Sequence, residues 1–170
     1  MCIRDRFKDM LLFRLSRIVA AGGAPVLRLC EGRYGITRRE WRVIASLPDG
    51  RPMLSSELAD HLRLDRARTS RAITSLVAKG LLRRDAVQGD QRKAAVALTD
   101  KGRALFASLF PQVQDMNEGI LSQFSDANLA LLDQMLHTLQ VQAERVGTLD
   151  GLPKANRRRG SLSSPAKSLE

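Results

Sequence analysis

The sequence predicts a mainly α-helical fold with one small β-hairpin, arranged as a winged helix-turn-helix between long flanking helices. Apolar residues within 56–79 recur at helical spacing in two short segments that a tight turn separates. Two short β-prone runs follow, joined by a polar segment that contains glycine. The chain has 170 residues, the length of one ordinary domain, and can bury a core without disulfides.

The helix-turn-helix is predicted from its apolar faces and its caps. The first helix has the inner face Leu58, Ala59 and Leu62. Asp65 can accept the free N–H groups of the second helix, and Gly80 can end it in a left-handed conformation. The second helix has the inner face Ile73, Leu76 and Val77 and carries Arg68, Ser70, Arg71, Thr74 and Ser75 on its outer faces.

The β-hairpin, or wing, is predicted from two strands, 81–85 and 94–98, with 87–93 as the polar connection. Residues 53–54 can add a minor strand beside it. A helix that exposes arginines and small hydroxyl residues fits the major groove of DNA, where arginine can bond guanine bidentately. An arginine at the tip of a hairpin fits the narrower groove beside it.

Three residues near helix N-termini are expected to meet DNA phosphates. Arg66 and Arg68 lie in the first turn of the second helix. Ser56 lies at the start of the preceding helix, where its hydroxyl and the free backbone N–H groups can bind an anion.

The chain resembles the MarR family of transcriptional regulators from about Leu11 to Arg145. The residues that carry the resemblance are GITRREWRVI at 35–44, Leu58-Ala59, Leu76 with Lys79-Gly80-Leu81, the wing residues Asp90-Gln-Arg92, and Leu98-Thr99-Asp-Lys-Gly102. Each motif is weak alone, but their order and spacing make the signal specific. The resemblance implies a repressor that binds double-stranded DNA at an inverted repeat as a homodimer and is released by a small aromatic acid.

The resemblance also implies particular DNA contacts. Ser70 and Arg71 match base- and phosphate-contacting positions of the family. An arginine at the position of Arg92 enters the minor groove, and the aspartate at the position of Asp90 holds it. The full set of expected DNA-binding residues is Ser56, Arg66, Arg68, Thr69, Ser70, Arg71, Thr74, Asp90, Arg92 and Lys93.

Amphipathic helices are predicted on both sides of the winged unit. Residues 7–30 form one apolar stripe, and Gly22-Gly23-Ala24-Pro25 is expected to bend or break it. Thr37 is expected to cap a helix over 38–47, with Glu40 completing a capping box.

Two further helices follow the wing. Thr99 is expected to cap the first of them, which Pro111 should kink. Ser125 or Asp126 is expected to cap the last. These helices have more apolar face than one small winged lobe can cover. The resemblance implies that they interleave with a second subunit.

The predicted organisation has four parts. Residues 1–36 form an N-terminal dimerisation helix and 37–99 the DNA-binding lobe. Residues 100–147 form C-terminal dimerisation helices, and 148–170 form a disordered basic tail that has almost nothing to bury.

Charge distribution favours a polyanionic partner over other classes. The chain has 28 basic and 18 acidic residues, and residues 38–93 hold 13 of the basic ones. An enzyme is disfavoured because the sequence lacks a phosphate loop, a catalytic triad and paired carboxylates in contrasting environments. A non-catalytic RNA-binding module is the other alternative, but it would need exposed aromatic residues, and the chain has only one Trp, one Tyr and five Phe.

Cysteine and histidine usage predicts no metal or other cofactor. Cys2 and Cys30 match no metal-binding spacing and no CxxC motif, which indicates a reducing cytoplasm. Some family members sense oxidants through a cysteine in the first helix, so a redox-sensing regulator is an alternative. Cys30 lies at the far end of that helix, however, and an inert thiol is favoured. His61 and His137 are isolated, and the sequence has no run of about 20 apolar residues that could span a membrane.

A site for an aromatic acid is implied by the resemblance alone. Family members commonly bind such ligands between the dimer helices and the DNA-binding lobe. The residues expected to line this cleft are Arg33, Tyr34, Trp41 and Arg42, although core packing explains Trp41 equally well.

Overall fold

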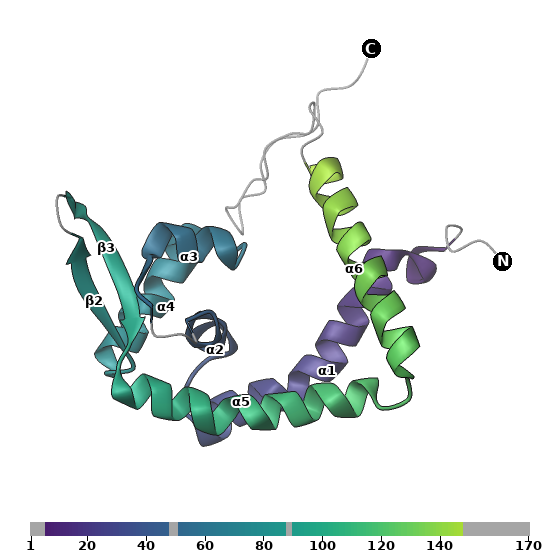
Figure 1. Ribbon diagram of the computed structural model, residues 1–170, viewed down its shortest axis with the longest axis horizontal. Coiled ribbons are helices and arrows are strands. Elements are labelled where there is room, and N and C mark those ends of the chain that lie inside the picture. Colours follow the sequence, from purple (N-terminus) through teal and green to yellow (C-terminus); the bar gives the residue numbers. More distant parts are fainter. Residues whose placement is uncertain (1–5, 48–50, 88–89, 148–170) are drawn as a thin grey trace, which may run out of the picture. The chain divides into compact units, whose positions relative to one another are not determined.

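The computed structural model describes residues 6–47, 51–87 and 90–147, and the side chains of residues 87–93 lie outside the description. The chain divides into two compact units, Met1–Gln123 and Phe124–Glu170. The first contains η1 (Phe7–Asp9), α1 (Leu11–Arg33), α2 (Arg38–Ala45), β1 (Met53–Leu54), α3 (Ser55–His61), α4 (Arg66–Ala78), β2 (Leu82–Val87), β3 (Asp90–Leu98) and α5 (Asp100–Leu121), and the second contains α6 (Asp126–Gly147) (Figure 1). Cys2 and the predicted tail, 148–170, lie outside the described residues.

The helix-turn-helix is confirmed as α3 and α4, which pack against each other. A carboxylate oxygen of Asp65 accepts the N–H of Arg68 at 3.0 Å, as predicted for the cap of α4. Ile73 and Leu76 are fully buried. Gly80 follows the helix with φ +69°, a left-handed conformation that favours glycine.

The sheet has three antiparallel strands in the order β1-β3-β2. The minor strand is confirmed, with Met53 opposite Val96. The wing strands are longer than predicted, because β2 and β3 continue into the polar segment that was expected to be loop. A polar sequence is compatible with an extended backbone, so polarity did not mark the strand ends. The register shifts between Ala86 and Val87.

The first of the two expected outcomes at Gly22–Pro25, a break in the helix, is wrong, because α1 runs unbroken through Pro25. Its glycines allow close packing instead. A Cβ at Gly22 would lie 2.9 Å from Cδ1 of Ile120, and one at Gly23 would lie 3.0 Å from the guanidinium of Arg38. These contacts bring α1 near α5 and α2, and packing of this kind maintains a helix that its local sequence disfavours.

The start of α5 is fixed to the turn that follows α4. The Thr99 hydroxyl accepts the N–H of Gly102 at 3.1 Å, which confirms the cap, and donates to the Gly80 carbonyl at 2.7 Å. A Cβ on Gly102 would lie 2.1 Å from the Leu81 carbonyl oxygen, so only glycine fits there. The helix continues through Pro111 without interruption.

The hydrophobic core lies within the first unit, between α2, α3, α4, the sheet and the first half of α5. Its largest fully buried side chains include Ile36, Ile44, Leu58, Ile73, Leu76, Leu98 and Leu109. In the second unit α6 buries no residue, and Ser125 caps it by accepting the N–H of Asn128 at 3.4 Å.

Candidate nucleic-acid interface

The outer face of α4 presents a polar and basic surface. Arg68, Ser70, Arg71 and Thr74 are exposed, as predicted, while Ile73 and Leu76 fix the opposite face in the core. The Thr74 hydroxyl donates to the Ser70 carbonyl at 3.0 Å. The helix is therefore held by its inner face, and its exposed side chains are available to a partner.

Thr69 does not belong to this surface. Only 1% of the residue is exposed, and its hydroxyl donates to the Asp65 carbonyl at 3.1 Å. Thr69 precedes Ile73 by four residues, so it falls on the inner stripe of the helix. Ser75, expected on an outer face, is half-buried and hydrogen-bonds to Glu40.

Arg66 and Ser56 are both exposed near helix N-termini. The Arg66 guanidinium lies 3.3 Å from the Asp60 carboxylate, and both side chains are largely exposed. Solvent screens an ion pair of this kind, so the arginine can exchange Asp60 for another anion at little cost. Ser56 lies in the first turn of α3.

Arg84 is a candidate interface residue that was not predicted from the sequence. It lies on β2, and its guanidinium donates to the Thr74 hydroxyl at 2.8 Å. Leu82, two residues earlier on the same strand, is buried. Because alternate strand residues share a face, this spacing could have placed Arg84 beside α4. The wing strand thus adds a cation to the exposed side of that helix.

The predicted contacts at the tip of the wing lie outside the described side chains. The backbone of Asp90, Arg92 and Lys93 belongs to β3, but their side chains are not described. Their DNA-binding roles stay predictions.

The four residues predicted to bind an aromatic acid make different contacts, and of the four only Arg42 lines the pocket described below. Trp41 is buried and stacks on Phe106, with 5.9 Å between ring centroids. The Tyr34 hydroxyl hydrogen-bonds with the Ser108 hydroxyl at 2.8 Å and accepts from the Gln112 amide at 2.6 Å.

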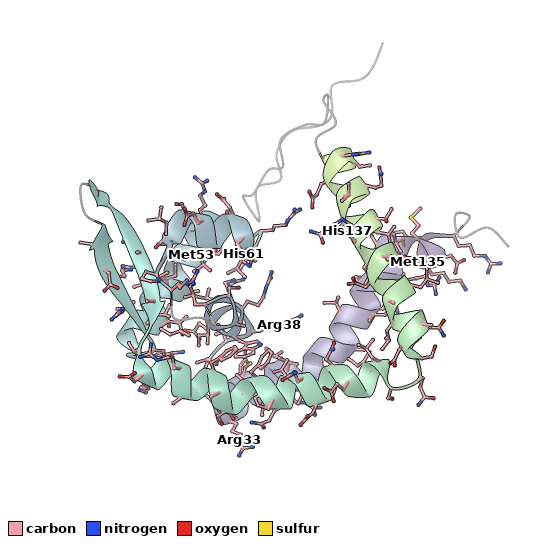
Figure 2. The ribbon with its side chains drawn as sticks, in the orientation of Figure 1. Arg33, Arg38, Met53, His61, Met135 and His137 are labelled. Carbon is pink, nitrogen blue, oxygen red and sulfur yellow. The ribbon has the colours of Figure 1, made fainter. Side chains whose placement is uncertain are left out.

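Arg33 also contacts α5, because its guanidinium donates to the Gln112 side-chain oxygen at 3.3 Å. Figure 2 shows Arg33 below α5 in the view and Arg38 extending from α2 above it. Packing against α5 therefore accounts for Arg33 and Tyr34 as structural residues.

Arg42 lines a different pocket, together with residues that were not predicted. The pocket has a volume of about 510 Å³ and is lined by Val19, Arg38, Arg39, Arg42 and Leu64. Three guanidinium groups and two apolar side chains suit an anion with an apolar part. Arg42 also donates to the Leu62 carbonyl at 2.9 Å. The signal in the sequence was the run of three arginines around one turn of α2.

Glu40 is a buried carboxylate between α2 and α4. Burial alone would raise its pKa, but hydrogen bonds from Ser75, the Thr37 N–H and Lys79, together with the Lys79 charge, hold the pKa below its ordinary value. The Thr37 N–H donates at 2.6 Å, and the Thr37 hydroxyl accepts the Glu40 N–H at 3.2 Å, which confirms the capping box.

Cys30 is a fully buried free thiol. Burial raises its pKa above the ordinary value, and the nearby Glu31 charge adds to this effect. A thiol in this state is a weak nucleophile, which disfavours the redox-sensing alternative. Within the described residues, no group of three or more His, Cys, Asp or Glu side chains could hold a metal ion. None of the described helices is long and apolar enough to cross a membrane.

Comparisons with known proteins agree with this architecture. Residues 34–93 match a family model described as the MarR family. A MarR family transcriptional regulator from Silicibacter pomeroyi DSS-3 is 31% identical, with a TM-score of 0.69 over 82% of this chain and 99% of that one. The homoprotocatechuate degradative operon repressor of Escherichia coli is 27% identical over 104 residues, which is 61% of this chain and 70% of the repressor.

The fold also matches that of a protein solved bound to DNA. In the S. aureus MepR–DNA complex, MepR is 19% identical, with a TM-score of 0.67 over 76% of this chain and 96% of that one. The S. pomeroyi protein is described as a transcriptional regulator and the E. coli protein as a repressor, which agrees with the prediction that the chain is not an enzyme. From the family match, the near-complete alignment with the S. pomeroyi regulator and the winged helix-turn-helix, we conclude that this chain belongs to the MarR family of transcriptional regulators.

Proposed function

We propose that this protein is a transcriptional repressor that binds a specific double-stranded DNA sequence as a homodimer. The observation that carries the proposal is the outer face of α4, where exposed arginines and hydroxyl residues project from a helix whose opposite face is buried. Such a helix fits the major groove, and Arg71 is the candidate for reading guanine. The relatives include a named repressor and a protein solved with DNA.

Phosphate contacts are proposed for the residues around this face. Arg66, Arg68 and Ser56 are exposed near the N-terminal ends of α4 and α3, where backbone N–H groups also favour anions. Arg84 adds a charge from the wing strand. Binding should therefore weaken as salt rises, by about 0.9 in the slope of log K against log salt for each phosphate contact.

The homodimer is proposed from the apolar side chains that the described chain leaves exposed. They include Leu12 on α1 and Met135 on α6, which are 73% and 52% exposed. Two copies of α4 related by a twofold axis would read half-sites about one helical turn apart on an inverted repeat.

Arg71→Ala provides the test of sequence-specific binding. The change should lower affinity for the selected site by about 1–3 kcal/mol and have much less effect on random DNA, if Arg71 reads a base edge. Titrations at several salt concentrations would measure both affinities. Wild-type protein that binds selected and random DNA equally would contradict the proposal, and equal losses for the variant would make Arg71 a phosphate contact.

Release by an aromatic acid is a second proposal, and the pocket lined by Arg38, Arg39 and Arg42 favours it. Guanidinium groups can hold a carboxylate, and Val19 and Leu64 can pack on a ring. The name of the E. coli relative refers to degradation of homoprotocatechuate, itself an aromatic acid. Titration of salicylate, benzoate and homoprotocatechuate into the protein–DNA complex tests this. Release of DNA no greater than that caused by an equal concentration of acetate would contradict this second proposal.

A further inference from the structure

Helix α2 holds α4, the proposed recognition helix, at both of its ends. Polar contacts from one turn of α2 reach the turn before α4 and the residue that ends α4. The two helices also pack directly against each other (Figure 1). The two end contacts differ in the burial of the α2 side chain that makes them, in the number of bonds and in their access to the pocket.

The contact at the C-terminal end of α4 is a network of several bonds between Lys79 and the buried carboxylate of Glu40. The Lys79 ammonium lies 2.9 Å from each carboxylate oxygen of Glu40 and donates to the Gly35 carbonyl at 2.9 Å. The Glu40 side chain is only 3% exposed. The Lys79 carbonyl in turn accepts from the Lys101 ammonium at 3.0 Å. Lys79 therefore joins α4 to α2, to the loop after α1 and to the start of α5.

The contact at the N-terminal end is a single, partly buried hydrogen bond from an arginine whose side chain is otherwise exposed. Arg42 donates one hydrogen bond, at 2.9 Å, to the Leu62 carbonyl in the turn before α4. The same Arg42 lines the arginine pocket, as does Leu64, which directly precedes the Asp65 cap. Whatever enters the pocket thus meets the group that holds this end of α4.

We propose that α2 mounts the recognition helix at two points of unequal strength, so that α4 can pivot. The Glu40–Lys79 contact is the fixed pivot at the C-terminal end. The Arg42–Leu62 contact is the releasable mount at the N-terminal end. An anion bound in the pocket would break this hydrogen bond by bonding to the Arg42 guanidinium itself. This proposal rests on the proposed function, because it explains how the pocket would act on the DNA-binding face.

The chemistry of the two contacts supports this division. The Glu40 carboxylate is buried, so moving Lys79 away would leave that charge without its partner, and the Glu40–Lys79 contact resists separation. A guanidinium bonds a carboxylate more strongly, and often bidentately, than it bonds a neutral carbonyl. A bound carboxylate would therefore draw Arg42 away from Leu62, and the end of α4 with Arg68 and Arg71 would gain freedom.

Hydrogen exchange of the full chain, read separately at the two ends of α4, tests the pivot. Arg42→Gln opens the proposed releasable mount, and Glu40→Gln weakens the pivot while a glutamine keeps the capping box. Arg42→Gln, or salicylate on the wild type, should speed exchange over residues 62–70 and leave 76–81 protected. Glu40→Gln should do the reverse. Asp100→Asn, which removes the exposed ion pair with Arg103, is the matched control and should change neither end.

Faster exchange at both ends in each variant would reveal general destabilisation and overturn the pivot. Salicylate that leaves residues 62–70 unchanged would overturn the release step. DNA affinity gives an independent reading: each Gln variant should lose about 2- to 30-fold for the selected site and much less for random DNA. Failure of the wild type to select a DNA site would count against the proposed function alone. The hydrogen-exchange pattern at the two ends of α4 would still show whether the pivot exists.

Discussion

The winged lobe and the helices around it differ in how their apolar surface is covered. All the described hydrophobic residues that are buried lie between Cys30 and Leu109. By contrast, α6 buries no residue, and the only buried residue of α1 is Cys30 near its C-terminal end. Phe7 and Leu12 are 71% and 73% exposed.

The described lobe buries its apolar residues within its own chain, and the exposed apolar residues of the helices support the proposal of a second subunit. Burying one large apolar side chain contributes about 1.5–3 kcal/mol, so burying several exposed ones against a partner would stabilise the complex substantially. Large contiguous apolar patches on a protein surface commonly mark interaction sites. The twofold symmetry of the proposed inverted repeat favours a second copy as the partner.

The largest expected effect comes from placing a charge on the apolar stripe of α6. Met135→Glu would bury an unpaired carboxylate in the proposed dimer, which costs several kcal/mol and should weaken self-association on the order of 100-fold. Sedimentation over a range of concentrations would measure it. Gln134→Glu places the same charge one residue away on the polar side and should leave the dimer intact. Equal behaviour of the two variants would show that this stripe is not the interface.

A large effect within the lobe is expected at the joint between α4 and α5. Gly102→Ala would place a Cβ 2.1 Å from the Leu81 carbonyl oxygen, so the backbone must move, at a cost of about 3 kcal/mol in unfolding free energy. Gly119→Ala, in the same helix, meets no atom within 4 Å and should stabilise by about 0.5–1 kcal/mol. Denaturant unfolding of both variants measures this contrast, and similar results for the two would contradict the close contact.

A smaller, pH-dependent effect is expected at Glu40. Because its pKa is lower in the folded protein than the ordinary 4.5, the carboxylate contributes stability above that pH and loses the contribution as pH falls through the folded value. The stability advantage of the wild type over Glu40→Gln should therefore be largest near neutral pH and shrink in acid. An advantage that is constant from pH 7 to pH 3 would contradict the ionised, paired state.

The smallest effect is expected at Cys30. In a Cys2→Ser background, the buried Cys30 thiol should react with iodoacetamide much more slowly in the native protein than after unfolding, because burial raises its pKa and blocks access. Mild peroxide should leave DNA binding unchanged. Rapid native labelling, or loss of DNA binding that a reductant reverses, would revive the redox-sensing alternative.

The sequence predicted those features of the fold that depend on local hydrogen bonds and on periodicity. The caps Thr37, Asp65 and Thr99 each accept the expected backbone N–H. The inner residues Ile73 and Leu76 are buried as predicted. These patterns are local because both bonding partners lie within a few residues of each other.

Features that depend on tertiary contact were missed or misread. The Gly22–Pro25 segment was expected to bend or break the first helix, but the helix is continuous and its glycines allow neighbouring helices to approach. Arg84 belongs to the candidate interface because β2 places it beside Thr74 of α4, a contact between residues of two different elements. Arg38 and Arg39 line a pocket together with Val19 and Leu64, which lie far from them in the sequence, so local patterns could not predict this pocket.

The central claim is that two copies of this chain bind one inverted repeat. Selection of bound fragments from genomic DNA, followed by measurement of the mass of the complex on the enriched site, tests it most directly. The account predicts enrichment of inverted repeats whose half-sites are centred about 10 base pairs apart, with two protomers on each. Fragments without a repeated element, or one protomer bound to the enriched site, would contradict it.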